Sequence, residues 1–230
     1  MARLAEQAVL RQLSGLSSQT NGIFWVAYSG GLDSQVLLTL SQKAVPQAQL
    51  RAIHINHGLN PQADAWQEHC RLYCAQLDVD FEFRKVKLNN TGRNLELKAR
   101  QARYAVLESI VQEDDYILMA HHQNDQIETV LYRLLRGSGP KGLAGIPVER
   151  KLGRGTLLRP LLKYSKEMLI EYAEASKLIW VEDGSNSNID FDRNYLRQEI
   201  IPALKARWPE AGKSIQRSAD LCIESEGLLN

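Results

Sequence analysis

The chain has 230 residues, of which 44% are hydrophobic, and its formal net charge is +1 at pH 7. That hydrophobic content is enough to build a core and argues against a disordered chain. No run approaches the roughly 18–20 consecutive apolar residues that a transmembrane helix needs, so we expect no membrane association. The cysteines are three, an odd number that suggests no disulfide framework and favours a reducing, cytoplasmic location.

The first two thirds of the sequence alternate between short apolar segments and segments with helical periodicity. Residues 1–16 predict an amphipathic helix, with too many charges for a signal peptide. The expected strands then cover 23–27, 50–55, 79–86 and 116–120, and the expected helices cover 34–43, 63–77, 94–112 and 125–135. This order predicts an α/β fold, a doubly wound parallel sheet with helices on both faces.

The sequence changes character after Arg136. Residues 148–152 and 156–158 flank Gly153-Arg154-Gly155 and predict a β-hairpin. A helix over 165–176, a fifth strand over 179–181 and helices over 192–207 and 211–228 are expected next. The α/β domain is therefore predicted to carry a small, mostly helical C-terminal extension.

The segment Tyr28-Ser29-Gly30-Gly31-Leu32-Asp33-Ser34 lies between the first expected strand and the helix after it. Its glycines let the backbone approach an anion, its serines offer hydroxyl groups, and the helix N-terminus adds partial positive charge. The spacing and lysine of a Walker A motif are absent, as is a GxGxxG dinucleotide motif. A glycine-rich turn before a helix is the simpler reading, but the order strand, SGGxDS, helix favours a phosphate-binding loop.

A second polar segment, HHQNDQIET at residues 121–129, follows the fourth expected strand. Side chains at the carboxyl end of a parallel strand face the ligand crevice, and Asp125 and Glu128 can share one helix face. Two carboxylates there can hold Mg²⁺ or accept a proton, or they can be acids favoured by the helix dipole. Zinc bound by His121, His122 and Asp125 is disfavoured, because adjacent histidines point apart and no cysteine is near.

Basic residues are concentrated in two stretches. Residues 133–166 contain nine Lys or Arg and one acid, and residues 84–103 contain seven Lys or Arg and one acid. Clustered positive charge on a nearly neutral chain indicates a surface for a polyanion such as RNA, although solvated basic faces would give the same pattern. The residues that we expect to contact RNA are Arg136, Lys141, Arg150, Arg154 and Arg193.

The SGGLDS loop resembles the PP-loop of the ATP pyrophosphatases, enzymes that cleave ATP between the α- and β-phosphates. Further segments, taken in order, resemble the tRNA(Ile)-lysidine synthetase family over residues 23–197. These segments are HINHGLNP (54–61), NLELKARQARY (94–104), HHQNDQIET (121–129), RGSGPKGLAG (136–145), RPLL (159–162), WVEDGSN (180–186) and RNYLR (193–197). The pair HHQNDQIET and RGSGPKGLAG is the most diagnostic.

The resemblance implies a two-step reaction on an isoleucine tRNA with a CAU anticodon. ATP adenylates the C2 oxygen of the wobble cytidine and releases pyrophosphate, and the lysine ε-amine then displaces AMP. The implied cofactors and partners are therefore ATP, Mg²⁺, L-lysine and isoleucine tRNA.

The resemblance also implies roles for individual residues. The ATP phosphates would be held by Ser29, Gly30, Gly31, Leu32, Asp33 and Ser34, and Mg²⁺ by Asp33 and Asp125. Asp33, Asp125 and Glu128 would be the catalytic carboxylates, the last two as metal ligands or as bases for the lysine amine. Arg100 and Arg103, three apart on one expected helix, would stabilise phosphate charge unless they form a solvated face. The family often has Asp where this chain has Asn56, so we expect no metal role for Asn56.

We expect three regions: a PP-loop ATP-binding domain over 1–145, a continuation of the catalytic domain over 146–210, and the start of a linker helix over 211–230. The last prediction treats the chain as the N-terminal catalytic portion of a longer enzyme, and a homodimer is one possible assembly. Two alternatives remain, another PP-loop tRNA-modifying enzyme such as a thiolase and a non-catalytic ATP- or RNA-binding protein. Thiolases need reactive cysteines, whereas Cys70 and Cys74 are four apart on an expected helix and suggest packing.

Overall fold

The computed structural model describes residues 2–86, 95–182 and 192–229 and divides the chain into two units. The larger unit comprises residues 1–120, 149–161 and 167–182, and the second unit comprises 121–148, 162–166 and 183–230. Both units are therefore assembled from discontinuous segments. The two units are defined by which residues pack together and not by function. The functional boundaries expected at residues 145 and 210 therefore stay predictions.

The larger unit is built on a six-stranded sheet with the strand order β3-β2-β1-β4-β6-β5. The strands are β1 (Phe24–Ala27), β2 (Leu50–Asn56), β3 (Asp80–Lys85), β4 (Tyr116–Leu118), β5 (Glu149–Leu152) and β6 (Gly155–Leu158). Neighbouring strands from β3 to β6 run parallel, whereas β5 pairs antiparallel with β6. The predicted doubly wound α/β fold is confirmed, with the predicted hairpin adding an antiparallel edge strand.

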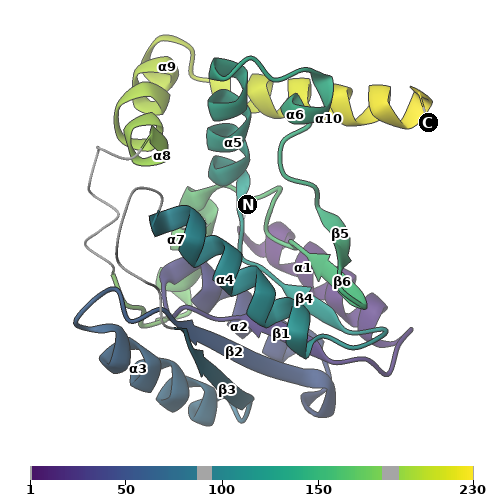
Figure 1. The fold of residues 1–230 in the computed structure, drawn as a ribbon, viewed down its shortest axis with the longest axis vertical. Helices are drawn as coiled ribbons and strands as arrows, with labels where there is room; N and C mark the ends of the chain where they lie inside the picture. Colours follow the sequence, from purple (N-terminus) through teal and green to yellow (C-terminus); the bar gives the residue numbers. More distant parts are fainter. Residues whose placement is uncertain (1, 87–94, 183–191, 230) are drawn as a thin grey trace. The chain divides into compact units, whose positions relative to one another are not determined.

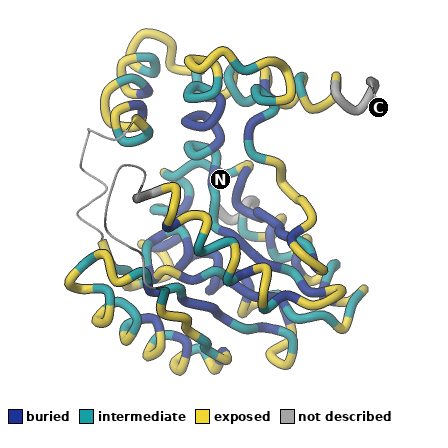
Figure 2. Tube along the Cα trace, viewed as in Figure 1, coloured by how far each residue is buried: buried dark blue, intermediate teal, exposed yellow. Residues whose placement is uncertain are grey.

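Helices cover both faces of this sheet. They are α1 (Ala2–Ser17), α2 (Leu32–Ala44), the short 3-10 helix η1 (Gln47–Gln49), α3 (Ala63–Gln76), α4 (Leu95–Ile110) and α7 (Lys166–Ala175). On one face, Leu107 of α4 and Val111 just after it pack against Trp25, Ile53 and Ile117. Figure 1 shows α4 in front of the sheet and α1 and α2, which pack together, behind it. The central strands are consequently buried, as the dark segments of Figure 2 show.

The amino ends of three parallel strands meet at Asp115, which is 5% exposed. Its carboxylate accepts hydrogen bonds from the backbone N–H of Ile23 (2.7 Å), before β1, and of Gln112 (2.9 Å), after α4. Its backbone carbonyl accepts the N–H of Thr156 in β6 at 2.9 Å. Gly155 has no room for a side chain, because a Cβ there would lie 2.6 Å from the backbone carbonyl oxygen of Asp115.

The second unit is helical. Its helices are α5 (Gln123–Leu135), α6 (Pro140–Leu143), α8 (Asp192–Tyr195), the π-helical turn η3 (Leu196–Ile200), α9 (Ile201–Arg207) and α10 (Ala211–Leu229). Helix α5 contacts α6, α10 and η3, and it supplies the buried side chains of Ile127 and Val130. The helices predicted over 192–207 and 211–228 are confirmed, the first as three consecutive helical pieces.

One predicted element is wrong. Residues 179–181 form no strand, and Ile179 is 71% exposed. The N–H of Val181 instead donates to the carbonyl of Gly30 at 3.0 Å, so this segment contacts the loop after β1 rather than the sheet edge. Residue 94, at which the helix over 94–112 was expected to begin, lies outside the described residues.

Among the described residues, no helix combines the length and the apolar character that crossing a membrane would require.

We expect Asp115→Asn to lower the free energy of unfolding by about 2 kcal/mol, the cost of leaving a buried donor without an acceptor. An amide has one acceptor oxygen, whereas the Asp115 carboxylate accepts two backbone N–H groups on different oxygens. The measurement is urea denaturation followed by circular dichroism. Asp114→Asn is the matched control, because Asp114 is exposed and its positive φ of 66° suits asparagine. Equal stability of the two variants would contradict this role of Asp115.

Candidate active site

The loop between β1 and α2 is shaped by its own serines. The Oγ of Ser34 donates to the carbonyl of Gly31 at 2.9 Å and accepts the N–H of Ser29 at 3.2 Å. The two hydroxyl oxygens of Ser29 and Ser34 lie 3.0 Å apart. The side chains of both serines therefore fix the conformation of the loop that precedes α2.

The N-terminus of α2 has no side-chain cap. Gly31 is the N-cap residue, and it has no side chain that could hydrogen-bond the first turn. The N–H groups at the start of an α-helix have no intrahelical partner, and together with the helix dipole they form an anion site. Asp33 lies in this first turn and is half-buried.

The loop approaches the layer beneath it closely. Gly30 has a φ of 85°, and a Cβ there would lie 2.9 Å from the Sγ of Cys70, so this position requires glycine. Below it, the Nδ1 of His54 donates to the carbonyl of Tyr28 at 2.9 Å. Burial lowers the pKa of His54, which keeps the imidazole neutral near pH 7 despite that hydrogen bond. The phosphate loop thus packs against buried, uncharged side chains, those of His54 and Cys70.

The cysteines of this layer are not reactive groups. Cys70 and Cys74 of α3 are both fully buried. Burial raises the pKa of the Cys70 thiol, and the neighbouring Cys74 raises it further. Burial also raises the pKa of Cys74 to about 12. Both residues stay protonated thiols at neutral pH, as the packing interpretation predicts.

Asn56 has a structural role at the carboxyl end of β2. Its buried amide donates to the Oδ1 of Asp64 (2.8 Å) and to the Oε1 of Gln67 (3.1 Å), both in α3. Its Oδ1 accepts the N–H of Gly58 at 2.9 Å. The side chain thereby fixes the HGLNP loop onto the first turns of α3.

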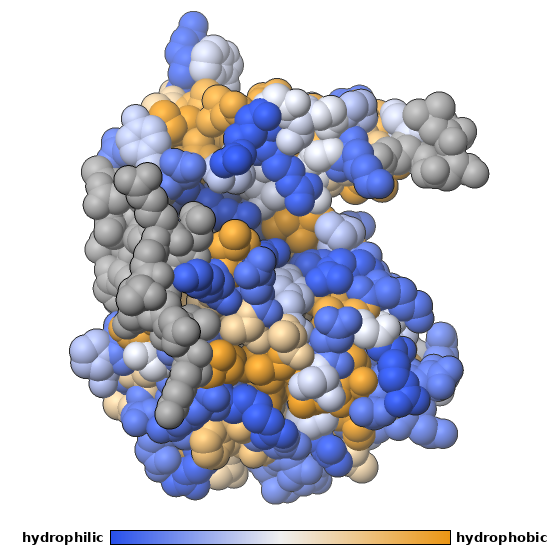
Figure 3. Space-filling model, viewed as in Figure 1, coloured by the Kyte–Doolittle hydropathy of each residue, from blue (hydrophilic) through white to orange (hydrophobic). Residues whose placement is uncertain are grey.

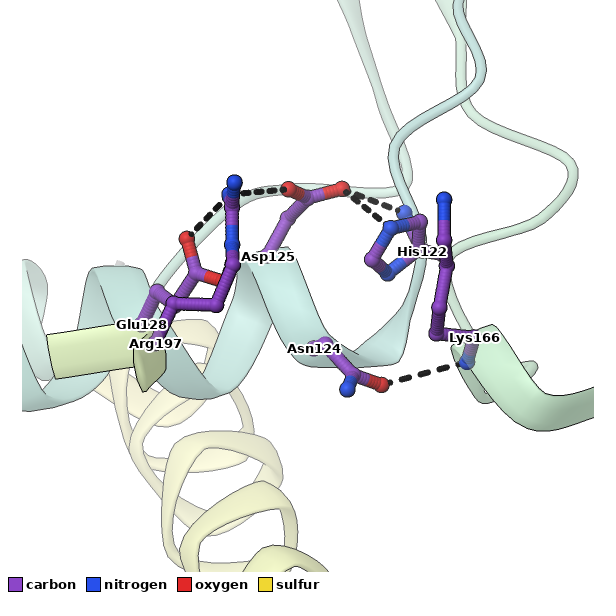
Figure 4. Close-up of polar contacts among 6 residues, drawn as sticks. All are labelled: His122, Asn124, Asp125, Glu128, Lys166 and Arg197. Atoms are coloured by element: carbon purple, nitrogen blue, oxygen red, sulfur yellow. Dashed lines mark hydrogen bonds and ion pairs between the residues drawn. The ribbon is translucent and has the colours of Figure 1, made fainter. Parts of the chain in front are cut away.

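The second unit contains the two acidic side chains of α5, and they have different surroundings (Figure 4). Glu128 is 1% exposed and accepts two hydrogen bonds from Arg197, from Nε at 2.7 Å and from Nη2 at 2.8 Å. Asp125 is more exposed and accepts the backbone N–H of His122 at 2.8 Å, which caps the helix. Its other oxygen lies 4.0 Å from Nη2 of Arg197. Glu128 is therefore committed to an ion pair, while Asp125 can reach a ligand.

The glycine-rich segment after α5 folds back onto that helix. The Nη1 of Arg133 donates to the carbonyls of Gly142 and Gly145, each at 2.8 Å. The Oε1 of Gln126 accepts the N–H of Ile146 at 2.5 Å. Gly145 has a φ of 70°, and a Cβ there would lie 2.6 Å from Gln126. The two most diagnostic segments of the sequence therefore meet, with Gly145 packed against Gln126.

The basic residues expected to contact RNA do not all belong to one unit. Arg150 and Arg154 lie on the β5–β6 hairpin of the larger unit, whereas Arg136, Lys141 and Arg193 belong to the second unit. Arg100 and Arg103 both lie on α4, as predicted. Sequence reasoning missed Arg197, because no local pattern links it to Glu128, 69 positions earlier.

The residues expected to bind a metal are likewise divided between the units, Asp33 in the larger and Asp125 in the second. Among the described ranges, no group of three or more His, Cys, Asp and Glu side chains is arranged to hold an ion. Mg²⁺ commonly binds through one or two carboxylates completed by substrate phosphates and water, so a carboxylate beside a phosphate loop fits its chemistry.

Comparison with known proteins defines the class. A family model described as a PP-loop domain matches residues 4–204, and the chain belongs to this family. Within it, the chain is similar to proteins named tRNA(Ile)-lysidine synthase. It is 49% identical to that of Alkalilimnicola ehrlichii over 98% of this chain and 51% of that protein, and 45% identical to that of Coxiella burnetii over 97% and 50%. The predicted resemblance is confirmed, and the chain spans about half the length of these curated relatives.

Solved structures show the same fold. The U34-tRNA thiolase NcsA of Methanococcus maripaludis superposes with a TM-score of 0.76 at 18% identity, covering 96% of this chain and 79% of that one. The NH3-dependent NAD synthetase of Campylobacter jejuni superposes with a TM-score of 0.56 at 14% identity, covering 99% and 95%. At these identities the likeness concerns the fold alone.

We expect Glu128→Gln to lower the free energy of unfolding by about 1–3 kcal/mol, because it leaves the Arg197 guanidinium without its bidentate partner. Glu210→Gln is the matched control, since Glu210 forms an exposed pair with Lys213 in the same unit and such pairs contribute about 0–1 kcal/mol. Urea denaturation of both variants makes the comparison. A Glu128→Gln variant as stable as its control would remove the structural role of this ion pair.

Proposed function

We propose that this chain carries the catalytic chemistry of lysidine formation, the ATP-dependent attachment of lysine to C2 of the wobble cytidine in isoleucine tRNA. The observation that carries the proposal is 43–49% identity to tRNA(Ile)-lysidine synthases over about 90–98% of the chain, together with an SGGLDS loop whose geometry suits phosphate. The substrates of the whole protein, ATP, L-lysine and isoleucine tRNA, belong to this proposal.

In the first step, the C2 oxygen of cytidine attacks the α-phosphorus of ATP and pyrophosphate leaves. The N–H groups at the start of α2, which has no side-chain cap, are suited to hold the departing pyrophosphate, because they are fixed before the reaction begins. Mg²⁺, held by Asp33 and the phosphates, would neutralise the charge on that leaving group. The serines of the loop keep the donors in place through the hydrogen bonds between Ser29, Ser34 and Gly31.

In the second step, the ε-amine of lysine attacks C2, the bond from C2 to the adenylated oxygen breaks, and AMP leaves. The free amine is protonated at pH 7, with a reference pKa of about 10.4, so a base must take one proton before attack. Asp125 is the better candidate of the two acids of α5, because Glu128 is buried in its pair with Arg197. We assign Glu128 to the positioning of Arg197 and assign Asp125 to contact with the lysine amine.

A sulfur-inserting reaction is the nearest alternative on this fold, since the thiolase NcsA shares it. Such chemistry needs accessible thiolates, and burial keeps Cys70 and Cys74 protonated and out of reach. This argues for lysine rather than sulfur as the group transferred.

The proposed function is tested by the release of AMP from ATP with unmodified isoleucine tRNA and lysine, each omitted in turn. AMP formation that depends on the tRNA, with lysine required for the modified nucleoside detected by mass spectrometry, supports the proposal. AMP formation that needs neither substrate, or ATP binding with no turnover under any condition, would sink it and favour the non-catalytic alternative.

We expect Asp33→Asn to retain part of its ATP affinity while tRNA-dependent AMP formation falls by at least about a hundredfold, the scale of a lost transition-state charge contact. Asp80→Asn is the control, because Asp80 is an exposed carboxylate of the same unit on the edge strand β3. ATP affinity by calorimetry and single-turnover AMP release separate binding from chemistry. Near-normal turnover in Asp33→Asn would remove this carboxylate from the mechanism.

A further inference from the structure

Three guanidinium groups converge on the phenol of Tyr104, a half-buried residue of α4 in the larger unit. The Cζ atoms of Arg100 and Arg150 lie 5.1 and 5.0 Å from the ring centroid. The Nη2 of Arg100 donates to the hydroxyl oxygen at 3.4 Å, and Arg150 and Arg159 hydrogen-bond the same hydroxyl. These arginines come from α4, β5 and the segment after β6, so only the tertiary structure assembles them.

Positive charge is crowded at this point. Arg159 is 3% exposed, and burial lowers the pKa of its guanidinium, with Arg150 and Arg100 lowering it further against the opposing effect of Tyr104. Burial of the phenol raises the pKa of Tyr104, but the charges of Arg100 and Arg159 and the hydrogen bonds from Arg150 and Arg159 outweigh it, and the pKa is lowered. Within the described part of the chain, no carboxylate pairs with Arg100 or Arg150.

Hydrogen-bond donors also exceed acceptors. Each guanidinium carries five N–H donors and no acceptor, whereas all three guanidinium groups share the single oxygen of one phenol. Arg100 and Arg150 are exposed, so a ligand can reach their remaining donors. A phosphate group supplies several acceptor oxygens and negative charge, and its geometry matches the planar fork of arginine.

We propose that Tyr104, Arg100 and Arg150, supported from below by Arg159, form a second phosphate-binding site that is separate from the SGGLDS loop and holds a phosphodiester of the RNA substrate. The identification of that phosphate as RNA rests on the proposed function. Two features favour RNA over the phosphates of ATP. Exposed Lys151 and Arg154 continue the positive charge along the hairpin, whose outer part is covered by hydrophilic side chains in Figure 3, and an aromatic ring flanked by arginines suits a nucleotide chain.

The test compares the wild-type chain with Arg100→Gln/Arg150→Gln, Arg100→Lys/Arg150→Lys and the control Arg11→Gln. Arg11 is an exposed arginine of α1 in the same unit. Binding of a fluorescent isoleucine tRNA transcript is measured by anisotropy from 50 to 200 mM salt, and binding of ATP is measured by calorimetry. Circular dichroism verifies that each variant is folded, which the exposure of the substituted side chains favours.

We expect the double Gln variant to bind tRNA about tenfold more weakly and to lose about 0.7–0.9 of a log–log salt slope unit for each lost phosphate contact, with unchanged ATP affinity. The double Lys variant should keep the salt slope but bind more weakly, because lysine lacks the bidentate fork. Weaker ATP binding with normal tRNA binding would assign the same site to a nucleotide phosphate.

A double Gln variant that matches Arg11→Gln for both ligands would overturn the site, and so would a double Lys variant with wild-type affinity, since charge alone would then suffice. These outcomes do not depend on turnover. If the double Gln variant binds tRNA with the wild-type salt slope and still forms lysidine, this site is ruled out and the proposed function stands. If the double Gln variant has a reduced salt slope but the wild-type chain shows no lysine-dependent chemistry, the RNA site stands and the proposed function is ruled out.

Discussion

The buried carboxylate of Asp115 is the interaction on which the arrangement of the larger unit depends. It accepts backbone donors from the residue before β1 and from the segment after α4, while its own carbonyl accepts a donor from β6. Fixing the amino ends of neighbouring parallel strands also fixes where their carboxyl ends lie. The loop after β1 and the helix α2 behind it are placed by that register.

The phosphate loop shows how little chemistry its side chains need to supply. The hydroxyl groups of Ser29 and Ser34 hydrogen-bond each other and the loop backbone, and Gly31 leaves the first turn of α2 without a side-chain cap. Gly30 packs closely against Cys70 of α3, so the loop lies in direct contact with this helix. A rigid row of backbone donors is the result, and preorganised donors stabilise a developing negative charge without reorganising.

The two acidic residues of α5 lie on one helix face but differ in their contacts with Arg197. Three residues apart, they share Arg197, but Glu128 takes both of its close hydrogen bonds and Asp125 remains 4.0 Å away. Burying Glu128 without that partner would carry a large desolvation cost. Arg197 lies in a π-helical turn, a local irregularity that recurs at functional positions of helices. The pair therefore holds the turn in place and leaves Asp125 accessible.

The sequence predicted most strands and helices in their order and the glycine-rich loop after β1, because hydrophobic periodicity and glycine spacing act within a few residues, while the class of chemistry followed from its resemblance to a known family. It misassigned residues 179–181 as a strand, since a short apolar run carries no information about whether a sheet edge is available; Val181 bonds Gly30 instead. The pairing of Glu128 with Arg197 and the meeting of Arg100, Arg150 and Arg159 at Tyr104 arise in the folded chain alone. Such meetings depend on how distant segments pack, and no spacing along the chain encodes them.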